Sequence, residues 1–424
     1  MEKIIYKKFL DHLFNFNLLS DSQHGFLRGR STLSQQLEIL NTLTSNLNKK
    51  IPTHMIFLDF SKAFDKVSHP KLIYVLQHYR VDNNVVNWIK SYFSDRVQRT
   101  VVDDHLSSAI SVSSGVPQGS VLGPLFFLMY INDLLVTITN KCDIEVYAFA
   151  DDIKLLGNSY TDLQNALNIV ATWSCTWQLS IHPSKSQHLT FNKTIIALKQ
   201  SFTINNNNIP KAHNIKDLGI QLTNDLSFNF HLQHIKLNAE RLSYFIFKSF
   251  KSRSLVIFIR AYKTYIRPIL EYNTSIWSPF KISDIKFIEN VQKRYTKKVC
   301  KLLNLKFNNY NDRLKIMGLE SLEYRRLKFD LILLYKIFNK IIYVDFDKFF
   351  ARKDLTSKYN LRRHQLYLEK FPKAKTAIRE NFFSFRIVNV WNSLPESVVK
   401  SISLPSFKLN LNKINLYNHY KFVF

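Results

Sequence analysis

Short apolar runs in the first half of the chain lead into aspartates. Residues 144–149 and 153–156 are rich in β-branched and aromatic side chains, which favours two buried strands. A pair of aspartates lies between these runs, so the pattern predicts a hairpin with adjacent carboxylates at its tip. A third apolar run, residues 55–58, ends at Asp59. The pattern therefore predicts neighbouring strands that carry carboxylates at one end.

Helical periodicity surrounds these strands and dominates the second half of the chain. Apolar positions recur at helical spacing before, between and after the strand-like runs, while residues 96–102 and 109–112 predict a hairpin. The pattern predicts an α+β protein. The helices are expected over residues 34–48, 71–78, 85–93, 161–178, 226–250, 255–266 and 282–302.

Charge is distributed unevenly along the 424 residues, which carry a net charge of +27. Residues 1–216 hold 21 Lys and Arg against 16 Asp and Glu, whereas residues 217–424 hold 38 against 16. An AT-rich codon bias would add lysine along the whole chain and does not explain this asymmetry. The second half is therefore expected to bind a polyanion such as nucleic acid.

Other bulk features exclude several classes of protein. The 46% hydrophobic content is sufficient for a packed core. No signal-peptide pattern and no apolar run of about 18 residues is present, so no membrane association is expected. The three cysteines, Cys142, Cys175 and Cys300, are too scattered for a disulfide framework or a zinc knuckle. An intracellular, reduced protein is expected.

The paired aspartates, Asp151 and Asp152, predict a site for divalent cations. Two adjacent carboxylates disfavour joint ionisation, and a hard cation such as Mg²⁺ relieves that repulsion. A solvated Asp-Asp turn is the alternative. With Asp59 as a third ligand, the set would hold two ions about 3.5–4 Å apart, the arrangement used for in-line phosphoryl displacement.

A glycine-rich segment, residues 114–125, lies between the aspartate motifs. Its glycines allow the backbone to approach a flat substrate, and Gln118 offers both a donor and an acceptor. Ser120 is expected to cap the apolar helix that follows.

These three segments together resemble the reverse transcriptases of non-LTR (LINE-type, jockey-like) retrotransposons. The resemblance rests on FLDFSKAFD at residues 57–65, GVPQGS at 115–120 and FADD at 149–152. It implies an RNA-directed DNA polymerase, a nucleotidyltransferase with a right-hand palm and fingers, a helical thumb and a helical tail. The implied cofactor is Mg²⁺, with Mn²⁺ as an alternative. The implied partners are an RNA template, a DNA primer and dNTPs.

The resemblance also assigns roles around the incoming nucleotide. It implies that Phe64 lies under the sugar and excludes a 2′-hydroxyl, with a core phenylalanine as the alternative. Gln118 and Gly119 are expected to contact the dNTP. Arg30, in a segment that resembles part of the fingers, would contact phosphates or be a solvated turn residue. Lys185 would protonate the leaving pyrophosphate or be a surface lysine.

Nucleic-acid contacts are expected in the second half. Residues 217–220 resemble the hairpin that holds the primer end, which places Leu218 and Gly219 at the primer grip. Four basic residues between positions 293 and 298 could contact phosphates, although they fall on more than one helix face. They are Lys293, Arg294, Lys297 and Lys298. Aromatic and basic residues also alternate at Tyr359, Arg362, Arg363 and Tyr367; stacking on RNA and ordinary core packing are the alternatives for these.

The resemblance implies a domain order. Residues 1–50 are expected to form partial fingers, 51–215 the palm, 216–305 the primer grip and thumb, and 306–424 a basic helical tail. Members of this family usually have a further fingers block before this point, so an N-terminally truncated chain is expected. The resemblance also implies action in the nucleus. The alternative function is a catalytically inactive relic that binds nucleic acid.

Overall fold

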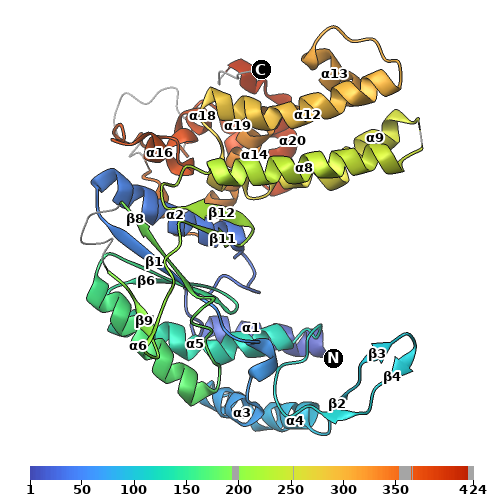
Figure 1. Cartoon of the computed structure of the whole chain (residues 1–424). Helices are drawn as coiled ribbons and strands as arrows, with labels where there is room; N and C mark the ends of the chain where they lie inside the picture. The colour runs from blue at the N-terminus through green and yellow to red at the C-terminus, as the bar shows by residue number, and fades with distance from the viewer. Residues whose placement is uncertain (193–199, 252, 353–363, 365, 419–424) are drawn as a thin grey trace. The chain divides into compact units, whose positions relative to one another are not determined.

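The computed structural model describes the chain except residues 193–199, 252, 353–363, 365 and 419–424 (Figure 1). The chain forms two compact units. Unit 1 comprises Met1–Gln35 and Ile51–His213, and unit 2 comprises Gln36–Lys50 and Asn214–Phe424. The two units combine an antiparallel sheet with many helices, which confirms the predicted α+β class.

Unit 1 is built on a four-stranded antiparallel sheet in the order β6-β7-β1-β8. The predicted apolar runs form three of its strands, which are β6 (Glu145–Phe149), β7 (Asp152–Gly157) and β1 (Thr53–Leu58). The fourth strand is β8 (Gln187–Phe191). Leu58 pairs with Ile153 and Phe149 with Asp152, so the aspartate-bearing ends of these strands meet at one edge.

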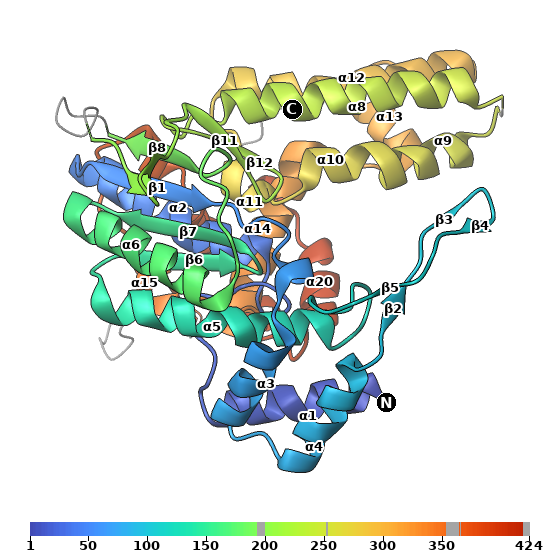
Figure 2. The ribbon, with the colours of Figure 1, turned by 60° about the horizontal axis from the view of Figure 1, so that its bottom comes forward.

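Helices cover one face of this sheet, as Figure 2 shows for α5 and α6. Alternate residues such as Ile56 and Leu155 point from the strands into the core, which they share with the buried apolar side chains of α5. The N-cap of α5 is Leu122 and not Ser120 as predicted, but Ser120 Oγ accepts the N–H of Gly123, the first residue of the helix, at 2.9 Å. Among its described residues, the helices of unit 1 are α1 (Glu2–Asn15), the 3₁₀ turn η1 (Phe64–Lys66), α3 (His69–His78), α4 (Asn83–Phe93), α5 (Gly123–Lys141) and α6 (Tyr160–Trp177).

The predicted hairpin between the first and second motifs is confirmed, and both views show it extending away from the rest of unit 1. Its strands are β2 (Val97–Gln98), β3 (Val101–Val102), β4 (His105–Leu106) and β5 (Ile110–Ser111). The small hairpin of β9 (Thr203–Ile204) and β10 (Asn207–Asn208) completes the unit.

Unit 2 is mainly helical, as predicted for the second half. Helix α2 (Thr32–Lys49) begins in unit 1 and continues into unit 2, where Gln36 donates to the carbonyl of Asp217 at 2.8 Å. The other elements are β11 (Asn214–Asp217), β12 (Ile220–Thr223), α8 (Asn229–Ser249), α9 (Leu255–Ala261), the π turn η2 (Tyr262–Ile266), α10 (Arg267–Glu271), α11 (Thr274–Trp277), α12 (Ile282–Leu302), α13 (Tyr310–Met317), α14 (Leu322–Phe338), α15 (Phe346–Phe349), α16 (Ala377–Glu380), α17 (Phe383–Arg386), α18 (Val388–Asn392), α19 (Glu396–Val399), α20 (Leu404–Lys413) and the 3₁₀ turn η3 (Leu416–Asn418).

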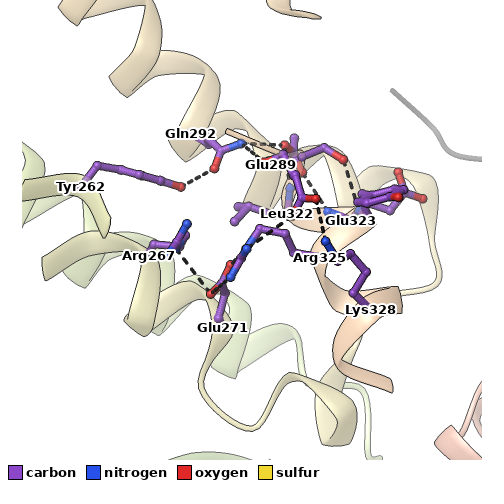
Figure 3. A network of polar contacts seen from close by, with 12 residues as sticks. Tyr262, Arg267, Glu271, Glu289, Gln292, Leu322, Glu323, Arg325 and Lys328 are labelled. Carbon is purple, nitrogen blue, oxygen red and sulfur yellow. Dashed lines mark hydrogen bonds and ion pairs between the residues drawn. The ribbon is translucent and has the colours of Figure 1, made fainter. Parts of the chain in front are cut away.

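A buried polar network joins α12 to α14 in unit 2 (Figure 3). Glu289 is 0% exposed and accepts the backbone N–H groups of Leu322 at 3.1 Å and Glu323 at 3.3 Å. Its carboxylate therefore caps the start of α14 from another helix. Beside it, Arg325 forms a two-pronged ion pair with Glu271, one contact of which measures 3.0 Å.

No helix within the described part of the chain is both long and apolar enough to span a membrane. The cysteines have no disulfide partners; Cys142 and Cys300 are buried and Cys175 is exposed.

Candidate active site

The site is built at the edge of the sheet where the aspartate-bearing strand ends meet. Asp59 follows β1, and Asp151 lies in the two-residue turn between β6 and β7. Both carboxylates are half-buried, whereas Asp152, the first residue of β7, is exposed. The antiparallel pairing of β1 with β7 thus gathers side chains that are more than ninety residues apart in the sequence.

Electrostatics link two of the three aspartates. Burial raises the pKa of Asp151, and the nearby Asp59 carboxylate raises that pKa further. Two half-buried, oxygen-donor carboxylates with mutual repulsion match what a hard divalent cation requires. The described residues contain no group of three His, Cys, Asp or Glu side chains close enough to hold an ion. Asp59 and Asp151 are suitable donors for such a cation, and the metal roles of Asp59, Asp151 and Asp152 all stay predictions.

The backbone around Asp59 is fixed by the segment before β8. The amide of Asp59 donates to Ser186 Oγ at 3.2 Å, and the amide of His182 donates to the carbonyl of Asp59 at 2.8 Å. Lys185 lies in the turn between these two partners, and its side chain is exposed. The structure therefore places the predicted general acid in a segment held against the first aspartate.

Phe64 is packed between aromatic rings. It stacks on Phe127 with ring centroids 4.4 Å apart and meets Phe26 edge-on at 6.2 Å. Its side chain remains half-exposed, so core packing and contact with a ligand are compatible. The carbonyl of Phe64 accepts the amide of Val116 at 2.8 Å, which joins the first motif to the second.

A hydrogen bond fixes Gln118 to the first motif. Its Nε2 donates to Asp65 Oδ1 at 2.8 Å, and its Oε1 is the acceptor of the same exposed amide. Close backbone approach requires a glycine at position 115, because a Cβ there would lie 2.8 Å from the carbonyl oxygen of Asp65. Gly119 has φ of +80°, and its surroundings are open. Together these contacts join the first motif, residues 57–65, to the second motif, residues 115–120.

A groove of about 660 Å³ lies beside Gln118. The base of the β2–β5 hairpin and the segment before Gln118 form its walls. Lys62 and Arg96 supply two cations to its lining, and Asp65, bound by Gln118, supplies one carboxylate.

Arg30 is engaged inside its own loop. Its guanidinium pairs with Asp21 Oδ1 at 2.6 Å and donates to the carbonyl of Gln23 at 3.2 Å. Contact with a triphosphate would compete with these local bonds, so the dNTP role of Arg30 stays a prediction.

The predicted primer-grip residues form the turn of the β11–β12 hairpin in unit 2. Leu218 and Gly219 have φ of +42° and +89°, as a two-residue hairpin turn requires. The hydroxyl of Tyr272 donates to the carbonyl of Leu218 at 3.0 Å. A Cβ at Gly219 would lie 2.9 Å from Tyr272 Cε1, so only glycine fits against this ring.

The basic cluster falls on α12, and its members have different surroundings. Lys293 lies over the Tyr310 ring, and burial lowers its pKa. Arg294 pairs with Glu240 at 2.9 Å, and Lys298 lies over Phe247. Lys297 is exposed. Tyr359, Arg362 and Arg363 lie outside the described residues, whereas Tyr367 contacts the ring of His364.

Sequence reasoning missed two supporting carboxylates. Asp65 orients Gln118, and its place within the first motif was the available signal. Glu2 accepts the amide of Val121 at 2.6 Å and the hydroxyl of Tyr92 at 2.7 Å, which holds the end of the glycine-rich segment. These bonds outweigh desolvation and lower the pKa of Glu2. No local pattern signals this long-range contact.

Residues 1–222 match the sequence family described as "Reverse transcriptase (RNA-dependent DNA polymerase)". The chain belongs to this family. Membership confirms the polymerase family that the motifs predicted. The assignment of the four-stranded sheet to the palm stays a prediction.

The relatives of this chain confirm the non-LTR, jockey-like resemblance. It is 28% identical over 312 residues to the RNA-directed DNA polymerase from mobile element jockey of Drosophila funebris, covering 70% of this chain and 34% of that protein. The corresponding Drosophila melanogaster protein is 27% identical over 314 residues, again 70% and 34%. The chain thus spans about a third of the length of these relatives. Apo telomerase from Candida tropicalis has a similar structure, with a TM-score of 0.43, 12% identity and coverage of 80% and 54% of the two chains.

Proposed function

We propose that this chain is an RNA-directed DNA polymerase that adds deoxynucleotides to a primer 3′-hydroxyl. The observation that supports this proposal best is the juxtaposition of the half-buried Asp59 and Asp151 at the sheet edge. The surface of Phe64 and Gln118 belongs to the same unit.

Asp59 and Asp151 would hold Mg²⁺, or Mn²⁺, with Asp152 as a third ligand. Bound divalent cations supply activation of the attacking hydroxyl and neutralisation of charge on the leaving pyrophosphate. The protein contributes two fixed, negatively charged oxygen donors. The bonds of Asp59 to Ser186 and His182 hold its backbone before any ligand binds.

Nucleotide selection is assigned to the joined first and second motifs. Phe64 would lie under the sugar and exclude a 2′-hydroxyl. Gln118, held by Asp65, would present Oε1 to the nucleotide, and Gly119 would allow close approach of the ligand. The neighbouring groove has room for a nucleotide-sized ligand and carries Lys62 and Arg96 for phosphate. Lys185 would protonate the leaving group.

Nucleic-acid binding is assigned mainly to unit 2. Unit 1 carries 18 Lys and Arg against 15 Asp and Glu, a net +3, whereas unit 2 carries 41 against 17, a net +24. Such an excess attracts a polyphosphate backbone and makes binding salt-dependent. Leu218 and Gly219 would support the primer end, and Lys297 is an exposed candidate for phosphate contact. We further propose that copying takes place in the nucleus.

Primer extension on a poly(rA)/oligo(dT) duplex with Mg²⁺ tests the proposal. Asp151→Asn should lower the extension rate by about 100-fold or more, because it removes one charged ligand. Asp143→Asn, an exposed aspartate just before β6, is the matched control and should leave the rate unchanged. Absence of extension by the unaltered chain, with salt-sensitive RNA binding retained, would contradict the proposed activity.

A further inference from the structure

The turn that carries Asp151 contains a non-glycine residue in the left-handed region. Ala150 has φ of +57° and lies between the end of β6 and Asp151. An L-residue is strained in this region and keeps the conformation only where its surroundings hold it there. Because Ala150 directly precedes Asp151 in the chain, its backbone conformation sets the direction in which that carboxylate leaves the turn.

The side chain of Gln23 holds this residue on both sides of its backbone. Gln23 Oε1 accepts the amide of Ala150 at 2.9 Å, and Gln23 Nε2 donates to the carbonyl of Ala150 at 3.4 Å. Gln23 is 1% exposed, so water cannot easily replace these bonds. A buried amide destabilises the fold when its hydrogen bonds are not made. Both polar atoms of the Gln23 amide bond to Ala150, so these bonds favour the observed conformation of the turn.

The segment that carries Gln23 is itself fixed beside β6. The amide of Ala148 donates to Ser22 O at 2.8 Å, and the amide of His24 donates to Ala148 O at 2.7 Å. Gln23 thereby pairs with Ala148 as a short parallel extension of the sheet. Gln23 Oε1 also accepts the amide of Gly25 at 2.8 Å, which fixes the side chain to its own loop.

Gly25 allows this segment to approach the turn. A Cβ at position 25 would lie 2.5 Å from the backbone nitrogen of Ala150 and 3.2 Å from the carbonyl carbon of Phe149. Both neighbours are backbone atoms, which cannot rotate away as a flexible side chain would. A side chain at position 25 would therefore displace the turn, the segment or both.

We propose that Gln23 and Gly25 are positioning residues that hold the turn of Asp151 in the geometry needed for catalysis. This inference rests on the proposed polymerase function. Gln23 acts through the Ala150 backbone on Asp151 and touches no substrate. Arg30 helps to hold the segment that carries Gln23, since it pairs with Asp21 and donates to the carbonyl of Gln23.

Three variants test this assignment. Gln23→Met keeps the approximate volume and removes all three hydrogen bonds, while Gly25→Ala adds only the obstructing methyl group. Asn132→Leu is the matched control, because Asn132 is another buried amide of unit 1. Its own contacts are with Ser20, Leu18 and Tyr79 and not with the turn. Because the carbonyl of Ser20 accepts the Gln23 amide at 3.3 Å, this variant measures what loosening of the segment does while the Gln23 side chain is kept. All three variants are expected to lose some stability.

The decisive readouts compare the turn variants with the control, because loss of stability alone would affect all three variants alike. Hydrogen exchange at the Ala150 amide should be fast in Gln23→Met and slow in Asn132→Leu. Binding of Mn²⁺ to the chain, followed by electron paramagnetic resonance, should weaken about 10–100-fold in both turn variants and not in the control. In primer extension, the kcat should fall by a similar factor with little change in KM for dNTP.

Unchanged Ala150 exchange and Mn²⁺ affinity in Gln23→Met and Gly25→Ala would overturn the inference. So would equal losses in Asn132→Leu, because these would indicate general loosening of unit 1. Exchange and Mn²⁺ binding need neither primer nor dNTP. They therefore decide the role of Gln23 even if the unaltered chain fails to extend a primer, which would contradict the proposed function separately.

Discussion

Phe64 serves packing and leaves a surface for a ligand. Its stack on Phe127, with rings inclined at 18°, contributes to the core of unit 1, while its half-exposed edge faces outward. Both interpretations of this residue, core side chain and sugar gate, therefore describe parts of the same ring. To distinguish the two roles, a substitution of Phe64 must be compared with a substitution of a neighbouring core residue that removes a similar amount of buried surface.

We expect Phe64→Val to destabilise unit 1 and to relax selection against ribonucleotides. Removal of buried ring atoms costs about 1–3 kcal/mol, and the smaller side chain leaves room for a 2′-hydroxyl. The measurement is the ratio of dNTP to rNTP incorporation during primer extension, alongside urea unfolding. Phe127→Leu should lower stability by a similar amount and leave the ratio unchanged. A ratio unaltered in Phe64→Val would make Phe64 a core residue only.

Candidate site residues could be predicted from the sequence where they lie at the end of a recognisable apolar run. Asp59 and Asp151 both follow such runs, so the pattern predicted that each ends a strand and that the two lie close together. Gln23 is different, because its amide acts on a backbone 127 positions away and no periodicity marks that contact. Arg30 also shows the limit of sequence reasoning, since its partner Asp21 is local but chosen by loop geometry.

At the scale of the sheet, a pair of buried histidines lies between β1 and β8. His54 Nδ1 lies 3.0 Å from His188 Nε2, and both side chains are 1% exposed. Burial, followed by the charges of His54 and Lys211, lowers the pKa of His188 to about 3. Burial and Lys211 also lower the pKa of His54, while a bond with Gln200 opposes them. Both rings are therefore neutral in the folded protein near neutral pH.

Unit 1 should consequently lose stability as the pH falls below about 6.5, the usual pKa of histidine in an unfolded chain. The unfolded state then binds protons that the folded state excludes, until the pH approaches the folded pKa near 3. Between pH 7.5 and 5.5, His188 alone should remove about 1.4 kcal/mol of unfolding free energy. Urea unfolding at both pH values measures this change.

The matched variants for this effect are His188→Gln and His105→Asn. His188→Gln should flatten the pH dependence, whereas His105 is exposed on the β3–β4 hairpin and its replacement should not. Equal pH dependence in the unaltered chain and in His188→Gln would show that this histidine does not titrate on unfolding.

Most individual elements followed the sequence pattern closely, since apolar periodicity reports which face is buried. Helix α12 begins and ends where its amphipathic pattern does, and the strands of the aspartate motifs extend the predicted runs by only a few residues. The division of the elements between the two units was harder to predict from the sequence. Helix α2 reads as one uniform helix, yet its later residues belong to unit 2 through bonds such as Gln36 to Asp217.

At the scale of the whole molecule, residues 216–305, predicted to form the primer grip and thumb, share one unit with the C-terminal region. Glu289 of α12 accepts hydrogen bonds from the start of α14 and from the Tyr310 hydroxyl at 2.5 Å. Gln292, one turn further along α12, donates to Tyr310 and to the carbonyl of Glu320. Residues beyond the thumb therefore complete polar groups that the thumb buries, so the two regions are expected to unfold together.

We expect Glu289→Ala to destabilise unit 2 by about 3–5 kcal/mol, because it strips buried donors of their charged partner. Hydrogen exchange followed by mass spectrometry should show faster exchange in both α12 and α14, with β1 and β7 unchanged. Glu240→Ala is the control, since its pair with Arg294 is largely exposed and such pairs contribute only about 0–1 kcal/mol. Faster exchange confined to α14 would mean that the carboxylate only caps that helix. Cooperative loss of both helices would instead identify the thumb and the C-terminal region as one folding unit, and RNA binding should then weaken in proportion to the unfolded fraction.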